Sequence, residues 1–147
     1  MVPGAFGIAG VQVGTWTSPA EVSGCTVVLA PAGSVGAIAV RGSAPGTREA
    51  AALSAEGKVE ICDAVVLAGG SAYGLAAADG VVRWLEAQGR GYPVLGAVVP
   101  IVGAAIVLDA AVLAPAERPS ADAGWAACEA AVAAGRPAPR PLEGRVG

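Results

Sequence analysis

A serine and a tyrosine stand at a glycine turn between two apolar segments, and this turn is where we expect chemistry. Residues 63–91 read D-A-V-V-L-A-G-G-S-A-Y-G-L-A-A-A-D-G-V-V-R-W-L-E-A-Q-G-R-G. The short apolar run breaks at two glycines, and an amphipathic helix follows from Ser71. Working groups are often exposed at such strand-to-helix turns. Gly70, Ser71 and Tyr73 are therefore candidate site residues.

The composition narrows the chemistry of this turn. The chain has no histidine, which excludes a Ser-His-Asp or Cys-His pair and any zinc site that uses histidine. Ser71 misses the G-x-S-x-G pattern because the second glycine falls at Gly74, and helix capping accounts for this serine. Neither glycine-rich phosphate-binding motif is present. On periodicity alone, Tyr73 is a packed residue at the edge of a helix.

Charged residues outside the turn have structural and functional interpretations. Arg48 and Glu49 follow a Gly/Pro loop, and they form an ion pair, orient a substrate or hold a neighbouring subunit. Asp109 follows an apolar strand and either reaches solvent or caps a turn, because an unpaired buried carboxylate is costly. Asp63 is interpreted as a strand-edge residue. The three cysteines are far apart, so we expect them to be reduced and packed, with no metal site and no cofactor.

The bulk composition indicates a subunit rather than an isolated monomer. The chain has 147 residues, of which 54% are hydrophobic and 14% charged. Its net charge of −3 argues against a nucleic-acid partner. The uncharged segment 96–108 is shorter than the ~20 residues of a membrane-spanning helix, so no membrane partner is expected. The N-terminus lacks the basic region of a secretory signal, and we expect a cytoplasmic protein.

The pattern of elements predicts a single domain over residues 1–147 with an α+β or layered αββα fold. We expect two long helices, Ser71–Gln88 and Ser120–Ala134, and a short one from Thr47 to Leu53. Residues 135–147 are expected to be a loop. Strands are predicted over residues 6–17, 24–30, 35–41 and 59–68, with one or two more in 98–108.

Several blocks, taken together and in order, resemble the DmpA-type family. That family contains L-aminopeptidase/D-esterases, β-peptidyl aminopeptidases and the nylon-oligomer hydrolase. The likeness extends over nearly the whole chain, which makes it more specific than any single motif. The matching blocks are residues 24–29, 40–49, 63–91, 99–102, 118–128 and 143–147.

The resemblance implies an N-terminal-nucleophile enzyme with an αββα sandwich of the DmpA/ornithine acetyltransferase type. Such a precursor cuts its own backbone, and the freed Ser or Thr becomes the nucleophile. Its α-amino group, with a pKa of about 8, serves as the general base. The chain then corresponds to roughly the N-terminal half, and the nucleophile lies on a C-terminal segment that is its partner. Implied substrates are short peptides, amides or esters with a free amino end.

The resemblance also implies roles for individual residues. Tyr73 matches an active-site tyrosine, which would hydrogen-bond substrate or nucleophile. Arg145 stands where many members have an asparagine suited to an oxyanion. We expect Ser71, Gly70 and Arg48 to contact substrate, and the subunits to form a homo-oligomer. Two alternatives remain: a non-catalytic fragment or scaffold subunit, and an acyltransferase of the ornithine acetyltransferase type. The G-G-S-A-Y-G and P-G-T-R-E blocks favour the hydrolases.

Overall fold

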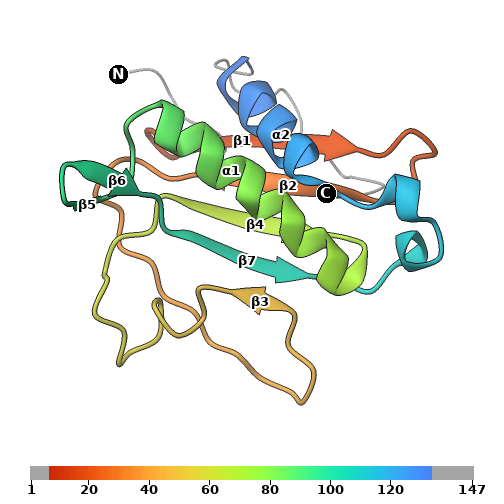
Figure 1. Ribbon diagram of the computed structural model, residues 1–147, viewed down its shortest axis with the longest axis horizontal. Coiled ribbons are helices and arrows are strands. Elements are labelled where there is room, and N and C mark those ends of the chain that lie inside the picture. Colours follow the sequence, from red (N-terminus) through yellow and green to blue (C-terminus); the bar gives the residue numbers. More distant parts are fainter. Residues whose placement is uncertain (1–6, 134–147) are drawn as a thin grey trace.

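The computed structural model describes residues 7–133, whose strands form a five-stranded sheet and a separate two-stranded hairpin (Figure 1). The order in the sheet is β1-β2-β4-β7-β3. Its strands are β1 (Gln12–Thr17), β2 (Gly24–Leu29), β3 (Thr47–Arg48), β4 (Ala64–Ala68) and β7 (Val102–Ile106). The hairpin consists of β5 (Tyr92–Val94) and β6 (Ala97–Val99). The helices are the 3-10 turn η2 (Ser71–Leu75), which continues into α1 (Ala76–Ala87), then η3 (Ala110–Val112), η4 (Pro115–Glu117) and α2 (Ala121–Ala133).

The strand β4 lies at the centre of the sheet between an antiparallel and a parallel neighbour. Val66 pairs with Val27 of β2 in antiparallel register and with Ala104 of β7 in parallel register. The parallel pair requires a crossover connection, which η2 and α1 supply. As a result, the carboxyl ends of β4 and β7 meet at one edge of the sheet, beside the start of η2 (Figure 1).

Both long helices cover the same face of the sheet. Side chains alternate along β4, so that Ala64, Val66 and Ala68 point to the helices and are at most 4% exposed. These residues and the inward faces of α1 and α2 form one hydrophobic cluster. The largest fully buried side chains of this cluster are Leu29, Leu85, Val27, Val66, Val81 and Val102.

Glycines allow the two long helices to approach closely. A Cβ atom on Gly124 of α2 would collide with the carbonyl oxygen of Ala77, and one on Gly80 of α1 would collide with the carbonyl oxygen of Ala121. Each glycine thus meets the backbone of the opposite helix. The prediction of two long helices is confirmed, and Ser120 Oγ accepts a hydrogen bond from the N–H of Ala123 at the start of α2.

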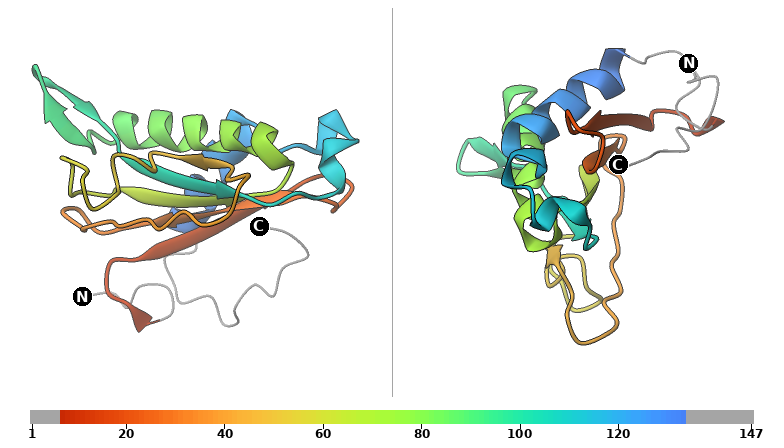
Figure 2. Two further views of the ribbon diagram at one scale, coloured as in Figure 1. Left: turned by 90° about the horizontal axis from the view of Figure 1, so that it is seen from below. Right: turned by 90° about the vertical axis from the view of Figure 1, so that its right-hand side faces the viewer.

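The opposite face of the sheet carries apolar side chains that the described residues do not cover. Val65 is 40% and Leu67 50% exposed, although both lie in the central strand. A small cluster of Leu53, Cys62 and Ile101 packs at one side of the sheet and leaves these two residues open. Figure 2 (left) shows α1 above the sheet. We call the surface around Val65 and Leu67 the open face.

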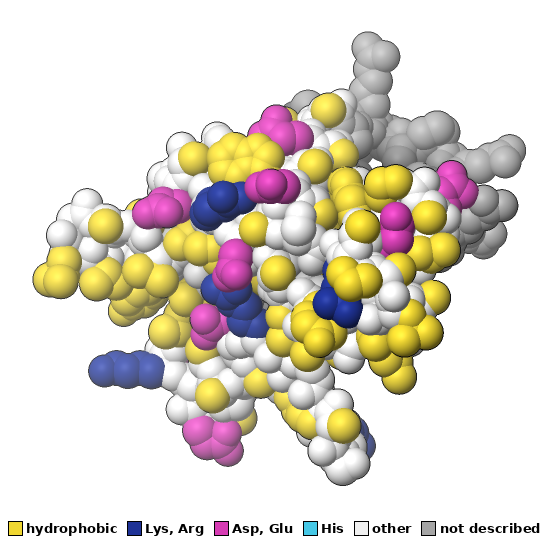
Figure 3. All heavy atoms as spheres, turned by 45° about the vertical axis from the view of Figure 1, so that its right-hand side comes forward, with side chains coloured by type: hydrophobic (Ala, Val, Ile, Leu, Met, Phe, Trp, Pro, Cys, Tyr) yellow, Lys and Arg dark blue, Asp and Glu magenta, His cyan; other side chains and the backbone are white. Residues whose placement is uncertain are grey.

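The hairpin β5–β6 projects beyond the sheet (Figure 2, left). All three residues of β5 are exposed, and Leu95 in the turn is fully exposed with a left-handed φ of 49°. Hydrophobic side chains gather on this projection at the left of Figure 3, whereas acidic and basic side chains lie next to one another over the helices. A two-stranded hairpin has little stability of its own in water.

The prediction of a third strand over residues 35–41 is wrong. Only Val35 forms an isolated bridge, with Ile61, and the N–H of Gly36 donates to Glu60 O at 3.0 Å. The segment could not pair with β2 because both edges of β2 are occupied, by β1 and by β4. A Cβ on Gly36 would also collide with Cys62. Residues 35–41 therefore pack closely against residues 60–62 instead of forming a ladder of strand hydrogen bonds.

The predicted short helix from Thr47 to Leu53 is also wrong. Thr47 and Arg48 pair with β7 instead, and Glu49 has a left-handed φ of 58°, which ends any right-handed helix. The strand predicted over residues 59–68 is shorter than expected and begins at Ala64.

Asp63 is a buried hydrogen-bonding residue at the start of β4, which corrects its interpretation as a strand-edge residue. It is 6% exposed, and its Oδ2 accepts the N–H of Ile101 at 2.9 Å. Its carboxylate also lies 3.9 Å from the Arg90 guanidinium, which donates to Ala30 O at 2.6 Å. Asp63 thereby fixes how β7 begins beside β4.

The fold is α+β, as predicted. The described residues make one sheet with helices on one face, and a second sheet facing the open face is not among them. Within residues 7–133, no helix is long and apolar enough to cross a membrane. The three cysteines are free and buried, in agreement with the expectation that they are packed.

Candidate functional site

The glycine turn at the end of β4 owes its shape to two consecutive left-handed residues. Gly70 has a φ of 80°, and Ser71, a non-glycine residue, has a φ of 57°. Gly69 has no room for a side chain, because a Cβ there would collide with Asp109 Oδ2 and Ser23 Oγ. The turn reverses the chain sharply and directs η2 and α1 back over the sheet.

A single carboxylate holds this turn. Asp109 Oδ1 accepts hydrogen bonds from the N–H of Gly70 at 2.9 Å and the N–H of Ala111 at 3.0 Å. Asp109 Oδ2 accepts a hydrogen bond from Ser23 Oγ at 2.8 Å. Asp109 therefore caps η3, as one of its two sequence interpretations predicted, and also joins the ends of β4 and β7 to the start of β2. Its role at the glycine turn was not predicted.

Ser71 does not cap the helix. Gly70 occupies the N-cap position of η2, and no side chain makes a capping hydrogen bond there. The left-handed φ of Ser71 places its backbone N–H on Val107 O at 3.0 Å, in the loop after β7. The capping explanation for this serine is therefore wrong. Ser71 is half-buried at the turn, beside the exposed Ala72 and Tyr73.

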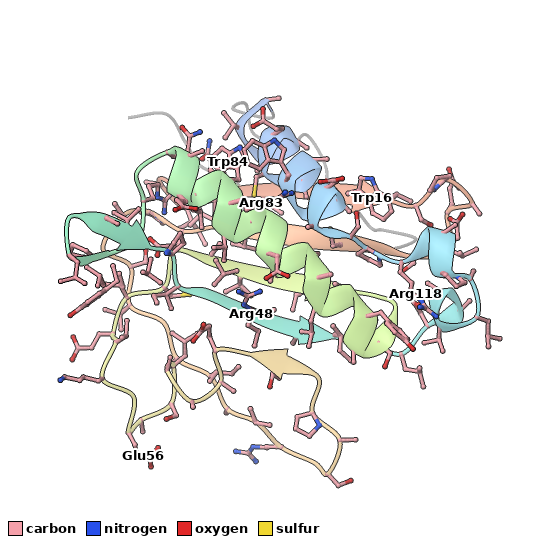
Figure 4. All side chains as sticks on the ribbon, viewed as in Figure 1. Trp16, Arg48, Glu56, Arg83, Trp84 and Arg118 are labelled. Carbon is pink, nitrogen blue, oxygen red and sulfur yellow. The ribbon has the colours of Figure 1, made fainter. Side chains whose placement is uncertain are left out.

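Tyr73 presents its ring at the surface of this edge. It lies in η2 and is 59% exposed. The guanidinium carbon of Arg118 lies 3.6 Å from the centre of its ring, which is a close cation–π contact. Arg118 Nε and Nη2 donate to the carbonyl oxygens of Ala111 and Val112 at 3.1 and 2.5 Å. Figure 4 shows Arg118 at the end of the molecule where η2 begins.

Arg48 lies on the edge strand β3 and forms a close ion pair with Asp79 of α1. Its partner is therefore the helix rather than the neighbouring Glu49. The strand β3 also contacts η2, and Arg48 pairs with Ala104 in the middle of β7. Arg145 lies outside the described residues.

The thiols are not candidates for a nucleophile. Burial raises the pKa of Cys25 and of Cys128 to about 12, and it also raises the pKa of Cys62. Thiols with such pKa values stay protonated at neutral pH, and the thiolate is the reactive form. Within residues 7–133, no group of acidic residues or cysteines is placed to hold a metal ion.

A shallow hollow lies between the two long helices, away from the glycine turn. It is lined by Arg83, Asp122 and Trp125. Arg83 donates to Asp122 at 3.0 Å and lies 6.0 Å from the Trp125 ring centre. Figure 4 places Arg83 far along α1 from Arg118. These side chains satisfy one another at the surface, and we assign no chemistry to them.

Comparisons with known proteins agree on one class of activity. The family model described as peptidase family S58 matches residues 6–145. An uncharacterized aminopeptidase of Mycobacterium leprae is 50% identical over 132 residues, which cover 84% of this chain and 36% of that protein. Uncharacterized aminopeptidases of Mycobacterium bovis and Mycobacterium tuberculosis are 56% identical over 108 residues, 74% of this chain and 31% of each. The chain thus spans about a third of the length of these relatives.

Proposed function

Because the chain belongs to peptidase family S58, we propose that it is the N-terminal segment of a self-cleaving aminopeptidase whose nucleophile lies on a further segment. Membership of the family and the names of the relatives support peptidase activity. The proposed substrates are short peptides, amides or esters with a free amino end, as the resemblance to DmpA-type enzymes implies.

The open face of the sheet is the observation that carries this proposal. A central strand with two large apolar side chains 40% and 50% exposed favours burial against another layer. Sheets stack face to face about 10 Å apart, and a second sheet covered by its own helices would complete an αββα sandwich. The relatives are about three times as long as the part of them that this chain matches, so they have residues for such a layer.

The proposed chemistry places both nucleophile and base on one residue of the added segment. The chain has no histidine, and its described thiols are buried. A freed N-terminal Ser or Thr needs neither, because its α-amino group accepts the proton of its own hydroxyl as that hydroxyl attacks the substrate carbonyl. We propose that Tyr73 hydrogen-bonds the substrate or the nucleophile, and that Gly70, Ser71 and Arg48 contact substrate. Arg145 is proposed as a donor to the oxyanion.

We also propose a cytoplasmic homo-oligomer. The exposed apolar hairpin β5–β6 supports association, because an isolated hairpin gains stability by packing against a partner. Three free cysteines in the described residues fit a reducing compartment.

The test uses the complete protein, meaning this chain joined to the segment that bears the nucleophile. Mass spectrometry of the purified protein should find two pieces, the second of which begins with Ser or Thr. Replacing that residue with Ala should leave the precursor uncut and abolish hydrolysis of amino-acid p-nitroanilides. Hydrolysis of an amide by the 147-residue chain alone would overturn the proposal. Acetyl transfer from acetylornithine without amide hydrolysis would indicate the acyltransferase alternative instead.

A further inference from the structure

Arg118 is held by backbone oxygens and by an aromatic ring. Arg48, Arg83 and Arg90 each lie within 4 Å of an aspartate. Arg118 also donates to two carbonyl oxygens, as Arg90 does, but within residues 7–133 it forms no ion pair, and its guanidinium carbon lies 3.6 Å from the Tyr73 ring centre. Two directional hydrogen bonds fix the plane of the guanidinium. Its carbon lies 3.6 Å from the ring centre, so the fixed guanidinium limits where the Tyr73 ring can lie.

The two carbonyls are themselves fixed relative to the glycine turn. Ala111 and Val112 form the turn η3, which Asp109 begins by accepting the N–H of Ala111. The same Asp109 oxygen accepts the N–H of Gly70, three residues before Tyr73. One carboxylate therefore sets the position of the tyrosine backbone and, through η3, the position of the guanidinium that covers its ring.

We propose that Arg118 is a positioning residue that holds the Tyr73 ring at the angle its hydroxyl needs, with Asp109 as the common anchor. This inference rests on the proposed function, in which the Tyr73 hydroxyl contacts substrate or nucleophile. Tyr73 is 59% exposed, so the described residues bury little of its ring. An exposed ring without a stacking partner samples several rotamers, and each misplaced rotamer lowers the fraction of productive complexes.

The first test is a double-mutant cycle in the complete protein. Arg118→Met removes the charge and the two hydrogen bonds while keeping a long side chain, and we expect kcat to fall roughly tenfold with little change in KM. In a Tyr73→Phe background, which keeps the ring but lacks the hydroxyl, Arg118→Met should have no further effect on kcat. Arg118→Lys, which keeps the charge without the planar fork, should restore only part of the rate. Arg83→Met is the matched control, since Arg83 faces Trp125 and Asp122 on the helices, and its kcat should equal that of the unsubstituted protein.

The second test measures the environment of the Tyr73 ring directly. Fluorine NMR of the complete protein labelled with 3-fluorotyrosine gives one signal for Tyr73, assigned by its loss in Tyr73→Phe. Arg118→Met should shift or broaden that signal, whereas Arg83→Met should leave it in place. The Tyr92 signal, from the hairpin, serves as an internal reference in each spectrum.

The outcomes separate this inference from the proposed function. An equal fall of kcat on Arg118→Met with and without the Tyr73 hydroxyl would overturn it, as would an unmoved Tyr73 signal. If the unsubstituted complete protein hydrolyses no amide, the proposed function fails. The fluorine spectra then still decide whether Arg118 holds the ring.

Discussion

The contact between α1 and α2 makes a sharp prediction about Gly124. An alanine at an interior helical position is normally about 1 kcal/mol more favourable than glycine. Here the added methyl group would collide with the carbonyl oxygen of Ala77. The carbonyl carbon and the Cα of Ala77 are the next nearest atoms. Because these are backbone atoms, they cannot swing aside as a flexible side chain would. Gly124→Ala should therefore lower the free energy of unfolding instead of raising it.

The magnitude follows from two opposing terms. Overpacking a well-packed contact costs about 1–3 kcal/mol, and a collision with backbone belongs at the upper end, about 3 kcal/mol. Subtracting the helical preference of alanine, about 1 kcal/mol, leaves a net loss of about 2 kcal/mol in the free energy of unfolding. For a chain of this size, that loss lowers Tm by about 4–8 °C.

Urea unfolding followed by far-UV circular dichroism measures the change. Ala130→Gly, at an exposed position of the same helix, is the matched control. It should cost about 1 kcal/mol through helix propensity alone. A Gly124→Ala chain as stable as the unsubstituted one, alongside the expected loss in the control, would show that the helices do not approach at this point.

The remaining predictions concern the site, the core and the start of β7. Tyr73→Phe in the complete protein should lower kcat with an unchanged Tm. A kcat equal to that of the unsubstituted protein would show that this hydroxyl takes no part in the reaction. Cys25 and Cys128 should resist a thiol reagent until the chain unfolds. Because their thiols stay protonated to about pH 12 when folded but ionise near pH 9 when unfolded, stability should fall as the pH rises from about 9 to 12; a flat profile measured by urea titration would contradict this. Asp63→Ala should cost about 2–4 kcal/mol by leaving the buried N–H of Ile101 without a partner and by removing the carboxylate 3.9 Å from the Arg90 guanidinium, and a loss below about 1 kcal/mol in the same assay would contradict that assignment.

Local patterns predicted the elements whose contacts are local or strongly periodic. The apolar run of β2 and the amphipathic pattern of α1 gave element type and approximate ends. The segment 35–41 shows where such patterns fail. It is a short apolar run with β-branched residues, as in a strand, but β2 has no free edge to receive it. Strand identity there depends on which edges are already paired, and no property of the segment itself contains that information.

The glycine turn between β4 and η2 was predicted from the sequence, whereas the exposure of Tyr73 beside it was not predicted from periodicity, and the roles of these residues in a site stay predictions. What holds them was not predicted, because the partners are far apart in sequence. Asp109 lies 39 residues from Gly70 and 86 from Ser23. A local signal existed for Asp109, since a carboxylate directly after an apolar strand needs a partner. Nothing local indicated that its partner would be the glycine turn. Arg118 had no local signal for its contact with Tyr73.

The open face also affects whether the two layers are better synthesised as one polypeptide or as separate chains. Two complementary layers synthesised as separate chains would have to meet by diffusion. Until they associate, each would expose an aggregation-prone apolar surface to chaperones and proteases. Two layers tethered in one polypeptide meet at an effective concentration in the millimolar range. Backbone scission after docking then costs the assembly little, since the buried surface already holds the pieces together. On the proposed function, the exposed Val65 and Leu67 thus explain why maturation would follow folding rather than precede it.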